Sequence, residues 1–135
     1  MGELLGELFS IESDFTPNEM NQTHGLDMLV NQPWGKTHAL VAVYEGTVVG
    51  MATVQTLIST AEGGPVGLLE DVIVDRKFRG RGIGTLLLDH IVDWGRSQNL
   101  KRLQLLADRE NSSALAYYEK HGWSTTNLIC LRKMS

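Results

Sequence analysis

The chain has 135 residues, a formal net charge of −4, and 42% hydrophobic against 21% charged residues. This length suits one domain, over residues 1–135, with a core of its own, and the composition excludes a disordered chain. No apolar run approaches the roughly 20 residues that a membrane-spanning helix needs, and a mildly acidic chain is a poor general binder of nucleic acid. Neither a membrane nor a nucleic acid is therefore expected as a partner.

The cysteine and histidine content bears on location and metal binding. The single cysteine, Cys130, can form no internal disulfide, and the opening MGELLGELFS lacks the basic region of an export signal. A reducing cytoplasm is the expected location, and Cys130 is expected to be a buried, unreactive thiol. The four histidines have no metal-type spacing with one another or with the cysteine, so no metal is expected.

Two helices are predicted near the start of the chain. Apolar residues recur at helical spacing over residues 1–13. Thr16-Pro17-Asn18-Glu19 then has the form of a capping box with proline at the first helical position. A second helix is expected from there to about Val30.

Three strands are predicted next. His38–Tyr44 suits a strand, and the tight turn Glu45-Gly46 leads into a longer one, Thr47–Ser59, which is rich in valine, threonine and isoleucine. A further turn with Gly63-Gly64-Pro65 precedes the mostly apolar strand Val66–Val74. The short turns predict an antiparallel meander.

The remaining elements predict a mixed α/β sheet. The segment Arg79–Gly84 leads into a helix over Thr85–Arg96, and a short apolar strand follows at Arg102–Ala107. Strand, helix and strand in this order make a right-handed crossover with a parallel pair. A last helix is expected over Ser112–Lys120, and a closing strand over Asn127–Met134.

The glycine-rich segment Arg79–Gly84 is the first candidate binding site. A glycine turn between a strand and a helix exposes backbone N–H groups, which bind phosphate together with the positive end of the helix dipole. The dinucleotide fingerprint fails because Thr85 stands where its last glycine belongs, and the P-loop fails because Val30 stands at its first glycine. A plain glycine-rich connection with solvated arginines remains the alternative for this segment taken alone.

The pattern R-x-x-G-x-G does fit, as Arg79, Gly82 and Gly84. The match extends from Leu68 to Trp123, through LLEDVIVDRKFRGRGIGTLLL and NSSALAYYEKHGW. Here the sequence resembles the GNAT family of N-acetyltransferases. The resemblance implies a GNAT-like acyl-CoA N-acyltransferase fold, acetyl-CoA as cosubstrate, and transfer of its acetyl group to a primary amine by direct attack in a ternary complex.

The resemblance also implies the cosubstrate-binding residues. The strand before the loop would pair through its backbone with the pantetheine arm, and its Val74 amide would face the thioester carbonyl. Asn111 would contact the same arm, and the loop would hold the pyrophosphate. The implied set is Val72, Ile73, Val74, Arg79, Gly80, Arg81, Gly82, Ile83, Gly84, Thr85 and Asn111.

Two catalytic residues follow from the same resemblance. Glu70 stands four residues before Val74, where related enzymes place a glutamate that takes the proton of the amine, directly or through water. Its neighbour Asp71 would point to the opposite face of a regular strand. A solvated or structural carboxylate is the alternative for Glu70.

The proposed acid is a tyrosine. Tyr118 follows Asn111 at the spacing of the family motif and would protonate the leaving thiolate, whereas Tyr117 points elsewhere around the helix. A role as a wall of the cofactor pocket is the alternative for Tyr118.

The sequence departs from the family at its start. Members begin with a strand before the first helix, and that strand is absent here, which leaves the edge of His38–Tyr44 open. A homodimer that covers this edge is therefore expected. The acceptor is expected to be a small cationic amine or a peptide amine, and a non-catalytic acyl-CoA sensor of the same fold is the competing interpretation.

Overall fold

The computed structural model describes residue 28 and residues 36–135. Met28 is helical, and the rest of the two helices predicted over residues 1–13 and 17–30 lies outside the described residues. The chain falls into two compact units, Met1–Leu105 and Leu106–Ser135, which are treated separately below. The single domain expected from the length stays a prediction.

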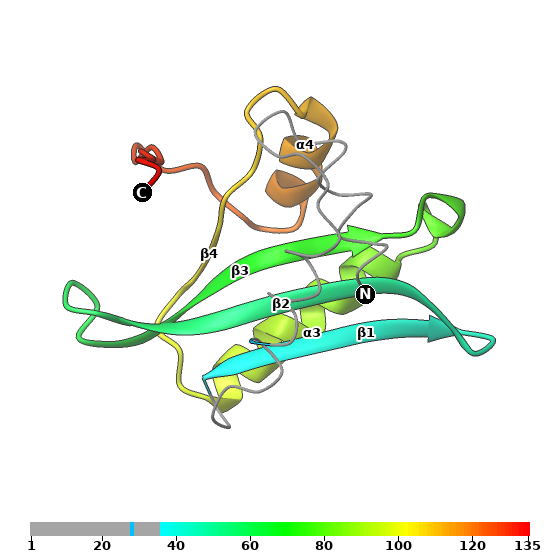
Figure 1. Ribbon diagram of the computed structural model, residues 1–135, viewed down its shortest axis with the longest axis horizontal. Coiled ribbons are helices and arrows are strands. Elements are labelled where there is room, and N and C mark those ends of the chain that lie inside the picture. Colours follow the sequence, from blue (N-terminus) through cyan, green and yellow to red (C-terminus); the bar gives the residue numbers. More distant parts are fainter. Residues whose placement is uncertain (1–27, 29–35) are drawn as a thin grey trace. The chain divides into compact units, whose positions relative to one another are not determined.

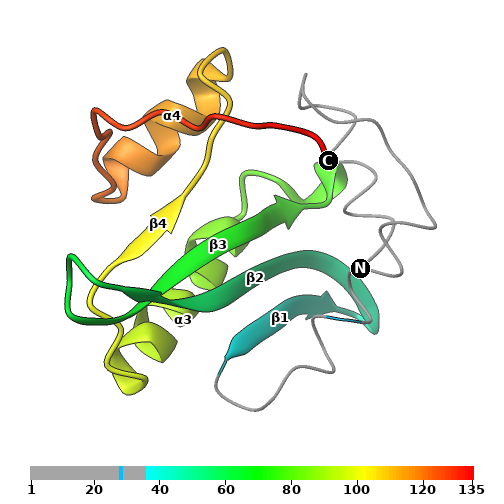
Figure 2. The ribbon, with the colours of Figure 1, turned by 60° about the vertical axis from the view of Figure 1, so that its left-hand side comes forward.

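The first unit contains a four-stranded sheet with the strand order β1-β2-β3-β4 (Figure 1). Strands β1 (Thr37–Tyr44), β2 (Thr47–Ser59) and β3 (Gly64–Val74) are antiparallel neighbours, which confirms the predicted meander. Strand β4 (Leu103–Leu105) runs parallel to β3, as the crossover requires (Figure 2).

Helix α3 (Ile83–Ser97) covers one face of this sheet (Figure 1). A short 3-10 helix, η1 (Arg76–Phe78), separates it from β3. A Cβ atom added to Gly50 on β2 would lie 3.2 Å from Leu87 Cδ1, so the helix sits directly on the strand there. The buried apolar residues of β2 and α3 include Val49, Met51, Ala52, Val54, Leu87, Leu88 and Ile91.

Several predicted boundaries differ from the structure, and β3, for example, begins at Gly64 rather than at Val66. Helix α3 begins at Ile83 rather than at Thr85, directly after Gly82 in a left-handed conformation. Strand β4 is confined to Leu103–Leu105 because only these residues form ladder pairs with β3. The apolar run therefore predicted the strand but not its length, because the length depends on how many residues pair with the neighbouring strand.

The second unit contains helix α4 (Ser112–Lys120), as predicted. Asn111 caps it, its side-chain oxygen accepting a hydrogen bond of 3.2 Å from the Ala114 amide. The predicted closing strand over Asn127–Met134 is wrong, because these described residues form neither helix nor strand. Cys130 is accordingly exposed rather than buried. An alternating apolar pattern makes a strand only where a neighbouring strand supplies the ladder.

Candidate active site

The loop before α3 has the backbone of an anion site. Gly80 and Gly82 have φ of 79° and 80°, in the left-handed region that favours glycine. A Cβ atom at either residue would meet nothing within 4 Å, so backbone conformation rather than space requires glycine. The first turn of a helix presents N–H groups without intrahelical acceptors, and Gly82 offers no side chain to cap them. This arrangement fits a phosphate or pyrophosphate.

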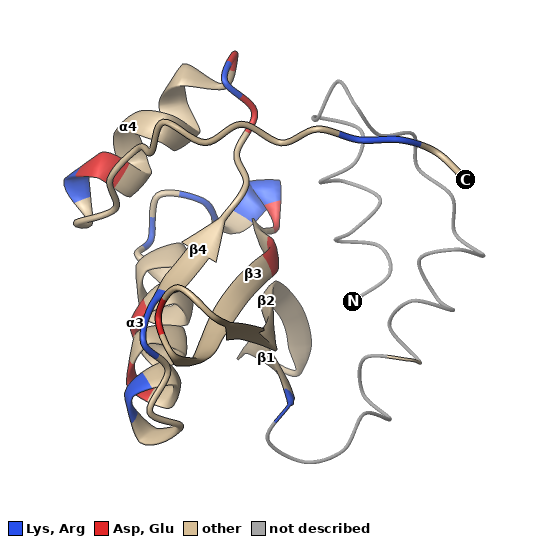
Figure 3. Cartoon of the chain, turned by 90° about the vertical axis from the view of Figure 1, so that its left-hand side faces the viewer, with Lys and Arg blue, Asp and Glu red and all other residues tan. Residues whose placement is uncertain are grey.

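The two arginines of the loop are held differently. Arg79 Nε donates a hydrogen bond of 3.0 Å to the Val74 carbonyl, which ties the loop to the end of β3. The Arg81 guanidinium lies 5.1 Å from the centre of the Phe78 ring. Basic residues lie on η1 and on the loop that leads to α3 (Figure 3). The positive charges thus accompany the backbone amides at the start of α3.

Strand β3 leads into this loop with one side that pairs with no described strand. Its parallel pairing with β4 ends at the pair Leu69 and Leu105. Along Glu70–Val74, the only described strand beside β3 is β2, where Val72 pairs with Ala52 and Val74 with Gly50. The outer backbone edge of Val72, Ile73 and Val74 is therefore available to an extended ligand arm next to the anion site.

Glu70 lies in a β-bulge. Asp71 pairs with Thr53 and Leu69 pairs with Val54, so Glu70 is an extra residue on β3. A bulge redirects a side chain and interrupts the alternation of faces, so the expected opposite orientation of Glu70 and Asp71 does not hold here. Instead the two carboxylates differ in burial: Glu70 is exposed and Asp71 is 9% exposed.

The electrostatics of Glu70 suit a proton acceptor. Partial burial, and then the charge of Asp71, raise its pKa above the ordinary value of a glutamate. Its carboxylate has no hydrogen bond or ion pair with a described residue. An open carboxylate with a raised pKa is a stronger base than an ordinary glutamate and remains available to a ligand.

Asn111 and Tyr118 belong to the second unit. The Asn111 side-chain oxygen is used to cap α4, which leaves its NH₂ group as a donor for a ligand. The Tyr118 ring lies 5.7 Å from the Tyr117 ring and 6.1 Å from the Trp123 ring, between centres. Helix α4 thus carries both candidate residues, one at its start and one in its last turn.

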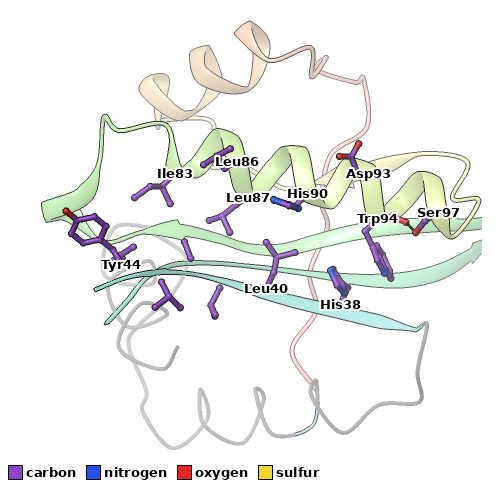
Figure 4. Close-up of a pocket in the computed structure, with 14 residues that line it drawn as sticks. His38, Leu40, Tyr44, Ile83, Leu86, Leu87, His90, Asp93, Trp94 and Ser97 are labelled. Carbon is purple, nitrogen blue, oxygen red and sulfur yellow. Dashed lines mark hydrogen bonds between the residues drawn. The ribbon is translucent and has the colours of Figure 1, made fainter. Parts of the chain in front are cut away.

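A cavity of about 670 Å³ lies elsewhere, between β1 and α3 (Figure 4). At one end the rings of His38 and Trp94 stack, with centres 4.7 Å apart and planes 5° from parallel. Burial lowers the pKa of His38. Leu40 and Leu87 point into the space between strand and helix (Figure 4). Sequence analysis missed this cavity because its residues carry no motif.

Comparisons with known proteins identify the fold family. Residues 5–123 match the family described as acetyltransferase (GNAT) family. The chain belongs to this family. A putative acetyltransferase from Agrobacterium tumefaciens shares the GNAT fold with a TM-score of 0.80 and 23% identity, over 98% of this chain and 90% of that one. The family implies acetyl-CoA as cosubstrate, and the glycine loop with the open β3 edge fits its pyrophosphate and its extended arm.

Curated GNAT relatives match over shorter segments. An uncharacterised N-acetyltransferase from Methanocaldococcus jannaschii is 29% identical over 72 residues, 53% of this chain and 32% of that protein. Glucosamine 6-phosphate N-acetyltransferase from Trypanosoma brucei brucei is 35% identical over 79 residues, 58% of this chain and 52% of that protein. The aligned part thus spans about a third to a half of these relatives.

Among the described residues, no helix is long and apolar enough to cross a membrane. Residue 28 and residues 36–135 also contain no group of three or more histidine, cysteine, aspartate or glutamate side chains that could hold a metal ion.

Proposed function

We propose that this GNAT protein transfers the acetyl group of acetyl-CoA to a primary amine by direct attack in a ternary complex. One observation carries the proposal. The glycine-rich loop at the start of α3 directly follows the β3 edge with which no described strand pairs, and that edge begins at the open carboxylate of Glu70. A long phosphorylated thioester requires an anion site followed by a backbone edge, and an amine acceptor requires a base next to them.

Each part of the site has a binding role. The loop residues Arg79–Thr85 bind the pyrophosphate, and the backbone of Val72–Val74 pairs with the pantetheine arm. The Val74 amide donates a hydrogen bond to the thioester oxygen, and the Asn111 side-chain amide binds the arm. Bound acetyl-CoA supplies the activated acetyl group.

Two side chains move the protons. The Glu70 carboxylate accepts a proton from the ammonium form of the acceptor, whose pKa in water is about 10.4. Tyr118 donates its hydroxyl proton to the leaving sulfur, and the second proton that the nitrogen loses as the amide forms restores the tyrosine hydroxyl. Because Glu70 must be unprotonated, the rate rises with pH through a pKa that lies above the ordinary glutamate value.

The acceptor is proposed as a small cationic amine or a peptide amine. The name of the Trypanosoma brucei relative adds a phosphorylated amino sugar to the small amines to be tested. A non-catalytic acyl-CoA sensor is the competing function, because every feature of the anion site would serve binding alone.

A thiol-release assay separates the two functions. The wild-type chain is supplied with acetyl-CoA and a panel of polyamines, amino sugars, amino sugar phosphates and basic peptides, and Glu70→Gln serves as the matched variant. We expect release with at least one acceptor and a loss of roughly 100-fold or more in Glu70→Gln. Cofactor binding by calorimetry without release on any acceptor would support the sensor instead.

We also propose a homodimer formed through the β1 edge. Of the described strands, only β2 pairs with β1, and Val41 and Val43 on β1 are 40% and 60% exposed. Lys36 and Glu45 flank β1 at its opposite ends. A second copy that pairs antiparallel brings the basic end of one β1 to the acidic end of the other. A cytoplasmic location stays a prediction from the sequence.

A further inference from the structure

Strand β3 has a buried polar pair beside the bulge that carries Glu70. Thr53 Oγ1 on β2 donates a hydrogen bond of 2.7 Å to Asp71 Oδ2 on β3. Thr53 is fully buried and Asp71 is 9% exposed. Burial of a carboxylate lowers the stability of the fold unless the carboxylate is hydrogen-bonded. A carboxylate at this buried position is therefore expected to have a function.

The pair faces away from α3. Gly50 and its cross-strand partner Val74 face the helix, and side chains alternate along each strand. Thr53 and Asp71 therefore lie on the other face, opposite one another. On the far side of the bulge, Val54 pairs with Leu69.

The Thr53–Asp71 hydrogen bond discriminates between registers. If the part of β3 from Glu70 onward slipped by one residue along β2, Glu70 would pair with Thr53, the bulge would vanish and Asp71 would move to the α3 face, away from its only described hydrogen-bond donor. The register without the bulge, in which Glu70 would pair with a residue of β2, would therefore lose the hydrogen bond of the buried pair. The hydrogen bond therefore favours the register that contains the bulge.

We propose that Asp71, held by Thr53, is a positioning residue for Glu70: the pair fixes the bulge that carries Glu70 and keeps a buried carboxylate beside it. The inference rests on the proposed role of Glu70 as the base. Thr53 and Asp71 touch no substrate in this role and act through Glu70.

The charges around the bulge support this role. The Asp71 charge contributes to the raised pKa of Glu70, while burial raises the pKa of Asp71 and the Thr53 hydrogen bond opposes that rise. Strands β2 and β4 present uncharged residues to the bulge, Thr53, Val54 and Leu105. The titratable residues of α3 are Asp89, His90, Asp93 and Arg96; all four are exposed, and His90 and Asp93 line the cavity toward β1, on the sheet face opposite to the Thr53–Asp71 pair. The Thr53 hydrogen bond favours the ionised form of Asp71 against the effect of burial, and the Asp71 charge in turn makes Glu70 harder to deprotonate and more basic.

A direct titration tests the proposal without turnover. The glutamate carboxyl carbons are labelled with ¹³C and followed by NMR against pH, and Glu70→Gln assigns the Glu70 signal by its disappearance. We expect the Glu70 midpoint to move to lower pH in Asp71→Asn and in Thr53→Val, and to stay in place in Thr53→Ser, which keeps the hydroxyl. An unchanged midpoint in Asp71→Asn and Thr53→Val would overturn the positioning role.

The kinetic arm separates this inference from the proposed function. The acidic limb of kcat/KM is expected to move to lower pH with the Glu70 midpoint in Asp71→Asn, and the plateau rate is expected to fall roughly 10- to 100-fold. A merely structural role would lower the rate at every pH and leave the limb in place. If the NMR midpoint moves while the limb does not, the base assignment of Glu70 fails and the electrostatic link from Asp71 stands. Should Asp71→Asn not fold, Thr53→Val and Thr53→Ser give the same comparison.

Discussion

Gly82 has a backbone conformation that favours glycine and also lies in the proposed binding loop. Its φ of 80° costs an ordinary L-residue about 1–2 kcal/mol, and its N–H stands at the start of α3. We predict that Gly82→Ala lowers the free energy of unfolding by about that amount and weakens acetyl-CoA binding in calorimetry. Gly82→Asn is the control, because asparagine adopts the left-handed conformation more readily. Unchanged cofactor affinity in Gly82→Ala would argue against the loop as the pyrophosphate site.

Tyr118 is tested by removing one oxygen. Because the proposed acid acts only when the thiolate leaves, we predict that Tyr118→Phe lowers kcat by roughly 100-fold and leaves the Kd of acetyl-CoA nearly unchanged. The neighbouring Tyr117→Phe removes the same atom from the same helix and should keep the wild-type kcat. Equal kcat values for Tyr118→Phe and wild type would assign Tyr118 to the pocket wall.

At the scale of elements, Gly67 controls how β3 meets β4. An added Cβ atom there would lie 2.6 Å from Leu103 Cδ2, 3.0 Å from Leu100 Cδ1 and 3.1 Å from Val54 Cγ2. Three neighbours must move together, so we predict that Gly67→Ala lowers the free energy of unfolding by about 1–3 kcal/mol in chemical denaturation. Gly64→Ala is the matched control on the same strand, because the nearest atom to its added Cβ is 3.5 Å away. Similar stability of the two variants would show that the leucines adapt.

The described elements show what the sequence can predict. The periodicity around Leu87 and Ile91 predicted α3 because a single amphipathic helix shows its buried face in its own residues. The meander followed from turns such as Glu45-Gly46, where both residues have the positive φ of a two-residue hairpin turn and glycine is favoured at the second position. Local signals of this kind need no knowledge of a partner element.

Other features depend on pairing and were missed. The bulge at Glu70 arises from a register shift between Thr53 and Val54, and no residue type announces it. The apolar pattern around Leu131 predicted a strand, yet that side chain is 85% exposed and has no ladder. The binding loop could be predicted because the backbone conformation of the loop itself requires its glycines. The direction of the Glu70 side chain could not, because it depends on how two strands pair.

At the scale of the whole molecule, the homodimer is the remaining prediction. An exposed strand edge invites a further strand, and soluble proteins seldom leave one uncovered. If two copies pair antiparallel through β1, the middle of the strand meets itself across a two-fold axis, at Val41. The exposed side chains there would be buried together with the apolar wall of the neighbouring cavity.

We predict a dimeric mass for the wild-type chain in light scattering at micromolar concentration and a monomeric mass for Val41→Lys, which sets two like charges beside each other at the axis. Ile58→Lys is the control: it adds the same charge at a side chain that is 78% exposed on β2, outside the β1 edge, and should stay dimeric. A monomeric wild-type chain would refute the dimer, and a dimer that survives Val41→Lys would place the interface on another surface. Because Glu70 lies on β3, which β2 separates from β1 in the strand order, Val41→Lys is expected to keep acetyl-CoA affinity, which separates loss of assembly from loss of the site.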